Sequence, residues 1–116
     1  MKKRFVEAEV LSEEPIVALS RAIAVLDTIE EVQAFLRDLC TPAELEALSD
    51  RWRVVPYLLD GVAYREIHDR TSVSVTTIGR VSRFLSDGSD GYQTAIRKLK
   101  RRKQWPETTS DDGAAS

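Results

Sequence analysis

The sequence predicts an all-α protein of about six helices with a helix-turn-helix unit in its second half. Apolar residues recur every three or four positions in successive segments, which is typical of amphipathic helices. Signals for the start of a helix precede several of these segments, and a turn of only three residues joins two of them. No segment shows the alternation of a β-strand, and none repeats another.

The first predicted helix covers residues 14–26 and is apolar on more than one side. Its main stripe consists of Ile16, Leu19, Ile23 and Leu26. Val17 and Val25 fall outside that stripe, so the helix needs cover from more than one direction. In so short a chain, the expected source of that cover is a second copy, which predicts a homodimer.

Two capping patterns start the next helices. Thr28 with Glu31 forms a capping box that opens a helix ending near Leu39. Thr41 repeats the pattern with a glutamate three residues later and a proline at the first helical position. The helix that follows carries the longest regular apolar stripe in the chain, which consists of Leu45, Leu48, Trp52, Val55 and Leu59. Pro56 is expected to bend its last turn, and Gly61 to end it.

The helix-turn-helix covers two short helical patterns, residues 64–71 and 75–86. Val73 lies between them as an apolar plug, and Ser74 is a good N-cap for the second helix. Ser72 stands where such motifs usually have a glycine at positive φ. His68 stands where a small residue usually lets the two helices approach. The turn is therefore expected to be slightly strained or reshaped.

The second helix of the motif divides into two faces at 100° per residue. The predicted inner face consists of Val75, Ile78, Val81, Ser82 and Leu85, and the outer face of Thr76, Gly79, Arg80 and Arg83. A threonine methyl can touch thymine, arginine can pair with guanine through two hydrogen bonds, and glycine permits close approach. The outer face therefore indicates a recognition helix that enters the major groove of double-stranded DNA.

The last predicted helix covers residues 91–103, with Tyr92, Ile96 and Leu99 on its inner stripe. Six cations crowd its end: Arg97, Lys98, Lys100, Arg101, Arg102 and Lys103. Cations there complement the helix C-terminus, so a solvated face and phosphate contact both remain open. Residues 104–116 lack any pattern and are predicted to be a disordered tail. Residues 1–103 are thus predicted to form a single domain.

Charge is distributed unevenly along the chain, although the net charge is only −2. Residues 1–50 carry 5 basic and 11 acidic side chains, whereas residues 51–103 carry 12 basic and 5 acidic ones. The last 13 residues add three acids. A basic half that contains the two-helix motif is the pattern expected for phosphate contact.

Catalysis, cofactors and metals are not indicated. The chain has one histidine and one cysteine, which exclude the usual metal-ligand and nucleophile spacings. A single thiol, no signal-peptide pattern and no long apolar run predict a cytoplasmic protein without a membrane span.

Three stretches carry a resemblance to a known family: DLCTPAELEALSDRWRV, LLDGVAYREI and TTIGRVSRFLSDGSDGY. Together they resemble the Trp repressor superfamily, specifically its Trp-repressor-related YerC/YecD family. The resemblance covers about half the chain strongly and implies interlocked dimers that regulate transcription. It also implies DNA contacts by Val75, Thr76, Thr77, Gly79 and Arg80, with His68 and Ser72 near phosphates. Arg83 is added from the helical wheel.

The resemblance further implies an effector pocket. In the Trp repressor, two arginines and a threonine hold an indole, and these match Arg51, Arg80 and Thr41. Val81 stands where the repressor has a glycine, and Phe84 stands where it has a serine. Because both substitutions fill the slot, tryptophan is not expected to be the effector.

The sequence thus predicts a sequence-specific DNA-binding transcriptional regulator, a repressor, acting as a homodimer on a palindromic operator. A helical protein-interaction module is one alternative, because similar helix pairs occur in domains that never touch DNA. A ligand-gated repressor with an unknown small-molecule effector is the other.

Overall fold

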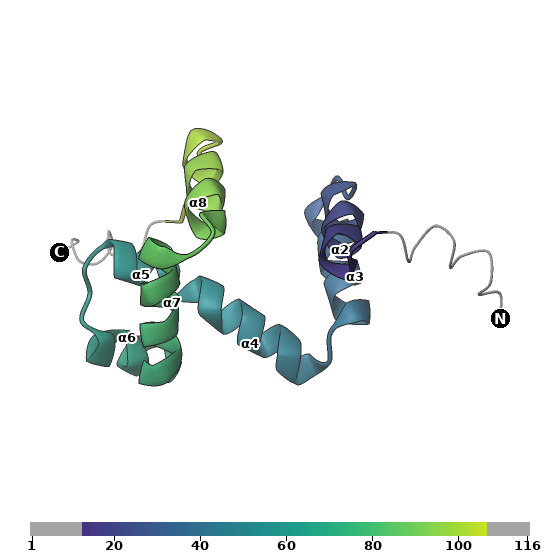
Figure 1. Cartoon of the computed structure of the whole chain (residues 1–116). Helices are drawn as coiled ribbons and strands as arrows, with labels where there is room; N and C mark the ends of the chain where they lie inside the picture. The colour runs from purple at the N-terminus through teal and green to yellow at the C-terminus, as the bar shows by residue number, and fades with distance from the viewer. Residues whose placement is uncertain (1–12, 107–116) are drawn as a thin grey trace. The chain divides into compact units, whose positions relative to one another are not determined.

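The computed structural model describes residues 13–106, and every regular element in that range is an α-helix (Figure 1). The helices are α2 (Pro15–Ala24), α3 (Ile29–Leu39), α4 (Pro42–Arg53), α5 (Val55–Leu59), α6 (Tyr64–Thr71), α7 (Val75–Asp87) and α8 (Gly91–Arg101). The all-α prediction is confirmed. The described residues contain no helix long and apolar enough to cross a membrane.

By internal packing the chain divides into two compact units, Met1–Leu45 and Glu46–Ser116. In the described part of the first unit, no side chain is fully buried. Ile16 is 63% exposed and Ile29 is 71% exposed. Local hydrogen bonds nevertheless define its helices. Thr28 accepts a hydrogen bond from the Glu31 amide at 3.1 Å and caps α3.

The second unit has its own hydrophobic core. Its fully or almost fully buried apolar residues are Val54, Val55, Ile67, Val73, Ile78, Val81 and Ile96. They come from the α4–α5 junction, from all three helices α6, α7 and α8, and from the turn before α7. Val73 is 3% exposed, so the plug predicted between the two helices of the motif is present.

The long helix predicted up to Leu59 is interrupted. α4 ends at Arg53 and α5 begins at Val55. The sequence predicted a bend in the last turn of one helix, but the structure has a break about one turn earlier. The cause is Pro56, which occupies the first turn of α5. Proline has no N–H to donate and its ring clashes with the carbonyl four residues earlier, so the helix has to restart. Gly61 has a φ of 75° and follows α5, as predicted for a terminator.

The predicted inner face of the recognition helix is wrong at its first residue. Ile78 and Val81 are buried and Leu85 packs against the core, whereas Val75 is 50% exposed. A helical wheel assumes that every position along the stripe meets a neighbour. Val75 is the first residue of α7, and no element of the unit covers it there.

The ordered chain extends beyond the predicted end of the domain at residue 103. After α8, Gln104 donates its amide to the Leu99 carbonyl at 2.8 Å, and Lys103 donates to Lys100 at 3.0 Å. With Lys103 at a φ of 59°, these bonds form a Schellman motif that reverses the chain. Trp105 then lies edge-on to Trp52, with ring centroids 6.1 Å apart. The rest of the predicted tail lies outside the described residues.

Candidate nucleic-acid interface

The turn of the helix-turn-helix is held by Ser72 and His68. Ser72 has a φ of 66°, the left-handed conformation for which glycine is usual, and its amide donates to the His68 carbonyl at 2.8 Å. The Nδ1 atom of His68 lies 2.8 Å from the carbonyl oxygen of Val73. Because a carbonyl can only accept, Nδ1 is the donor. His68 therefore fixes the turn from the side and keeps Nε2 free for another partner.

Thr71 satisfies the remaining buried backbone groups of the turn. Its hydroxyl donates to the Ile67 carbonyl at 2.7 Å and accepts from the Val73 amide at 3.1 Å. Thr71 is only 6% exposed, so an apolar side chain there would leave the Val73 amide without a partner. The turn thus obtains a fixed geometry without the usual glycine, at the cost of a strained Ser72.

The N-terminus of α7 is capped by Ser74, as predicted. The Thr77 amide donates to the Ser74 hydroxyl at 3.1 Å, and that hydroxyl donates to the Thr77 hydroxyl at 3.0 Å. Thr77 is half-buried and contributes to the cap. Val75 and Thr76 are exposed beside it. This end of α7 therefore offers a methyl group, a hydroxyl and the positive pole of a helix dipole.

Farther along α7, Arg80 and Arg83 are exposed and both approach Phe84. The guanidinium carbon of Arg80 lies 4.9 Å from the Phe84 ring centroid, and that of Arg83 lies 5.9 Å from it. Phe84 therefore lies against Arg80. Gly79 is half-buried, and a methyl group there would lie 3.9 Å from Tyr64 Cε2, an ordinary contact. Packing within the chain does not require glycine at this position.

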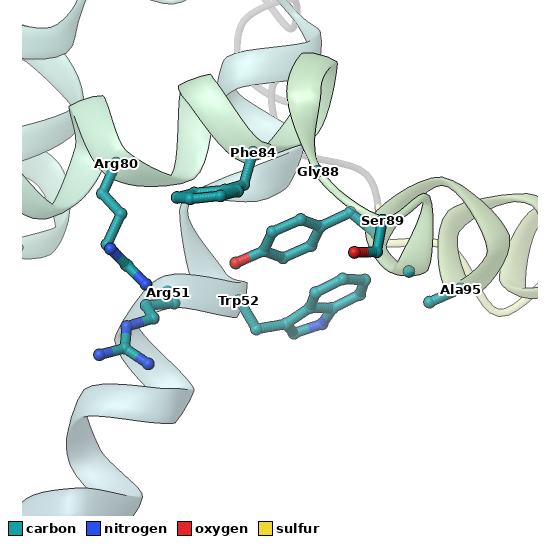
Figure 2. A pocket seen from close by; sticks show the side chains of 9 residues that line it. Arg51, Trp52, Arg80, Phe84, Gly88, Ser89 and Ala95 are labelled. Atoms are coloured by element: carbon teal, nitrogen blue, oxygen red, sulfur yellow. The ribbon is translucent and has the colours of Figure 1, made fainter. Parts of the chain in front are cut away.

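A pocket of about 420 Å³ lies where the end of α4 meets α7 and α8 (Figure 2). It is lined by Arg51, Trp52, Arg80, Phe84, Gly88, Ser89, Gly91, Tyr92 and Ala95. In the view of Figure 2, Arg51 and Arg80 lie toward one end, and Ser89 and Ala95 toward the other. Three of the five residues expected at an effector site are therefore brought together: Arg51, Arg80 and Phe84.

The other two expected pocket residues lie elsewhere. Val81 is 1% exposed within the core and does not line this pocket. Thr41 belongs to the first unit, where it forms a reciprocal capping box with Glu44. The Glu44 amide donates to the Thr41 hydroxyl at 3.1 Å, and the Thr41 amide donates to the Glu44 carboxylate at 2.9 Å.

Sequence reasoning missed the aromatic wall of the pocket. Trp52 and Tyr92 stack with ring centroids 6.2 Å apart and ring planes 9° apart. Each residue lies on the predicted inner stripe of its own helix, but the stripes do not reveal that these two residues meet. Among the described residues, no group of three or more His, Cys, Asp and Glu side chains could hold a metal ion.

The chain is similar to known proteins over most of its length. The sequence model described as "Trp repressor protein" matches residues 14–100. The uncharacterised protein YerC of Bacillus subtilis (strain 168) is 38% identical over 82 residues, which are 71% of this chain and 79% of YerC.

Two solved structures are similar as well. One is a TrpR-like protein from Eubacterium eligens ATCC 27750, with a TM-score of 0.69 and 33% identity, covering 84% of this chain and 97% of that one. The other is a candidate Trp repressor from Staphylococcus aureus, with a TM-score of 0.70 and 34% identity, covering 79% and 92%.

Proposed function

Because this chain belongs to the Trp repressor family, whose members are DNA-binding regulators rather than enzymes, we propose a specific role in transcription. The protein is a sequence-specific DNA-binding repressor that acts as a cytoplasmic homodimer on a palindromic operator. The observation that carries the proposal is the exposed N-terminal half of α7, held at a fixed angle to α6 by the Ser72–His68 turn.

The proposed DNA contacts fall into two groups, contacts to bases and contacts to phosphates. Arg80 and Arg83 are the base-reading cations, and Val75 and Thr76 offer apolar contact to a thymine methyl. Gly79 permits close approach of the duplex. His68, Ser72 and the capping residue Thr77 lie near phosphates. Phosphate contacts contribute affinity but carry no sequence information.

The homodimer is supported by the exposed apolar side chains of the first unit. Ile16, Val17, Ile23, Val25 and Ile29 are all exposed in the single chain. Such side chains are buried when a second copy packs against them, and interlocked helices would join both units of a chain into the single domain expected for residues 1–103. Two recognition helices related by a twofold axis then read half-sites about 34 Å apart.

The test begins with selection of bound DNA sequences by the purified protein. On the selected site, Arg80→Ala and Arg83→Ala should each weaken binding by about 1–3 kcal/mol and relax the preference at one position of each half-site. Arg37→Ala, which removes an exposed cation from α3, is the control and should leave site preference unchanged. Selection that returns no preferred sequence, or equal effects of all three changes, would disprove the proposal.

Tryptophan is not the effector in this proposal. The ring of Phe84, held against Arg80, already presents an aromatic surface where the pocket would receive an indole. Arg80 then remains available to read bases, and DNA binding needs no corepressor. Calorimetric titration with tryptophan should show no saturable heat up to millimolar concentration. Phe84→Ser is the complementary variant, because Phe84 lines the pocket and removing its ring makes space for an indole, whereas Val81 lies in the core.

A ligand-gated repressor is the second candidate, and the pocket favours it. Its volume of about 420 Å³ lies within the range of small-molecule sites, and it combines two guanidinium groups with three aromatic rings. A gel-shift assay of purified protein with and without a cell extract depleted of macromolecules separates the two candidates. Full affinity without extract supports the effector-free repressor.

A further inference from the structure

The C-terminal half of α8 and the turn after it carry more positive charge than the recognition helix. Six exposed cations lie there: Arg97, Lys98, Lys100, Arg101, Arg102 and Lys103. We call these residues the basic end of α8. The sequence has no aspartate or glutamate from residue 91 to residue 106. By comparison, α7 has two arginines and an aspartate.

Ion pairs in the described part of the chain do not neutralise this charge. In residues 13–106, none of the six cations forms an ion pair with a carboxylate. Lys100 lies near an aromatic ring instead, with its Nζ 5.6 Å from the Trp105 ring centroid. Like charges three and four residues apart on a helix repel one another, as Arg97 and Arg101 do here. The helix dipole supplies the equivalent of only about half a negative charge at the C-terminus. Among residues 13–106 the cluster therefore has no carboxylate partner.

The basic end of α8 is also remote from the start of α7, where the phosphate contacts are proposed. α7 is 13 residues long, so about 20 Å of helix separates the turn from the start of α8. α8 lies beyond α7 on the side away from α6 (Figure 1). At physiological ionic strength the screening length is about 8 Å. Charges on α8 therefore add little to the phosphate contacts proposed at the start of α7.

The end of α8 is fixed by contacts on two sides. The Schellman motif at Lys103 closes the helix, and Trp105 packs against Trp52. Ile96 anchors the opposite side of α8 in the core at 5% exposure. The cations are therefore displayed outward from a fixed helix, which reduces the ordering that binding requires.

From these observations we propose that the basic end of α8 is a second, sequence-independent binding surface for duplex DNA. It would hold a DNA segment other than the operator segment at α7, so that one dimer bridges two segments. Nucleic acid is the favoured occupant because the cluster has no carboxylate to select a mixed-charge partner. DNA bound at α7 also supplies further duplex at high effective concentration. This inference rests on the proposed function only for the operator duplex at α7. The binding of a duplex at α8 does not depend on it.

The test is a bridging assay with two duplexes. Operator DNA is fixed to beads, protein is added, and capture of a labelled duplex of unrelated sequence is measured against salt. The test variant is Arg97→Gln/Lys98→Gln/Arg101→Gln/Arg102→Gln, since glutamine keeps good helix propensity. It should bind the operator as the wild type does, yet capture the second duplex at least about tenfold less well. The salt slope of capture should fall by about 0.9 for each phosphate that the variant no longer neutralises.

The matched control keeps the charge at the same positions. Arg97→Lys/Arg101→Lys/Arg102→Lys should retain capture, because sequence-independent phosphate binding needs charge more than guanidinium geometry. Circular dichroism in the tryptophan band verifies that Trp52 and Trp105 keep their packing in both variants. Unchanged capture by the glutamine variant would refute the proposal, as would absence of capture by the wild type at about 0.1 M salt.

Two further arms identify other occupants. The first arm is a variant that removes the acids of the tail, Glu107→Gln/Asp111→Asn/Asp112→Asn. If this variant captures the second duplex and the wild type does not, the chain's own acidic tail occupies the cluster and the proposal fails. If polyglutamate displaces the duplex at equal charge concentration, the surface is one for acidic proteins and the proposal also fails.

Protein immobilised by an amino-terminal tag and carrying Arg80→Ala/Arg83→Ala tests α8 without any operator. Loss of operator recognition alone would thus count against the proposed function and not against this inference.

Discussion

The two units of this chain use similar apolar side chains with opposite results. In the second unit, Ile67 and Ile78 are completely buried among side chains of the same unit. In the first, Ile16 and Ile29 remain mostly exposed, although their helices are just as regular. Local hydrogen bonds and caps thus suffice to define a helix boundary, whereas burial depends on what packs against the helix. The two units therefore differ in burial and not in the regularity of their helices.

The largest expected effect tests the self-contained core. Ile67→Ala should lower the free energy of unfolding by about 2–5 kcal/mol, because it leaves a cavity in a site with no exposed surface. Urea denaturation at two protein concentrations measures the loss. We expect the loss to be similar at both concentrations, since the cavity lies within one chain. A loss below about 1 kcal/mol would show that the second unit does not pack as described.

The same isoleucine-to-alanine change in the first unit makes the comparison sharper. On the single chain, Ile16→Ala removes a side chain that is already 63% exposed and should cost less than about 0.5 kcal/mol. In the proposed homodimer the side chain is covered, and the change should cost about 1–3 kcal/mol of dimer stability. Sedimentation across a dilution series decides between the two values. We expect the variant to dissociate at higher concentration than the wild type.

Helix caps should respond equally in the two units. Thr41→Ala removes the cap of α4, and Ser74→Ala removes the cap of α7. Each should cost about 1 kcal/mol, since a capping hydroxyl serves amides of its own first turn. Thermal unfolding of the two variants provides the comparison. Thr41→Ser and Ser74→Thr are the controls, and both should stay close to the wild type. If only one of the two alanine variants lost stability, the ends of these helices would not be defined by local hydrogen bonds alone.

The smallest expected effect is a gain in stability at the turn. Ser72→Gly should raise the free energy of unfolding by up to about 1 kcal/mol, because glycine adopts a φ of 66° without strain. Ser86→Gly, at an exposed position within α7, is the control and should lower it by about 0.5 kcal/mol. Both values come from chemical denaturation. Stabilisation by both changes would mean that φ at Ser72 is not the source of the gain.

Much of the fold could be predicted because its signals are local. Thr28, Thr41 and Ser74 act on amides within three residues, so their capping roles are visible in the sequence and are confirmed in the structure. The two helices of the motif and the buried plug Val73 follow from the same short-range spacing. The DNA-contact and effector roles of the site residues remain proposals.

What the sequence by itself determined is therefore the set of helices apart from the break between α4 and α5, the turn that joins α6 to α7 and the faces of most helices. Only the tertiary structure decided that Val75 is open, that Trp52 meets Tyr92, and that Trp105 returns to the core. The physical reason is distance along the chain. Hydrogen bonds within one helical turn join residues only three or four positions apart, so a short stretch of sequence predicts them. Contacts between residues 40 or more positions apart, such as Trp52 and Tyr92, depend on how all the intervening helices pack.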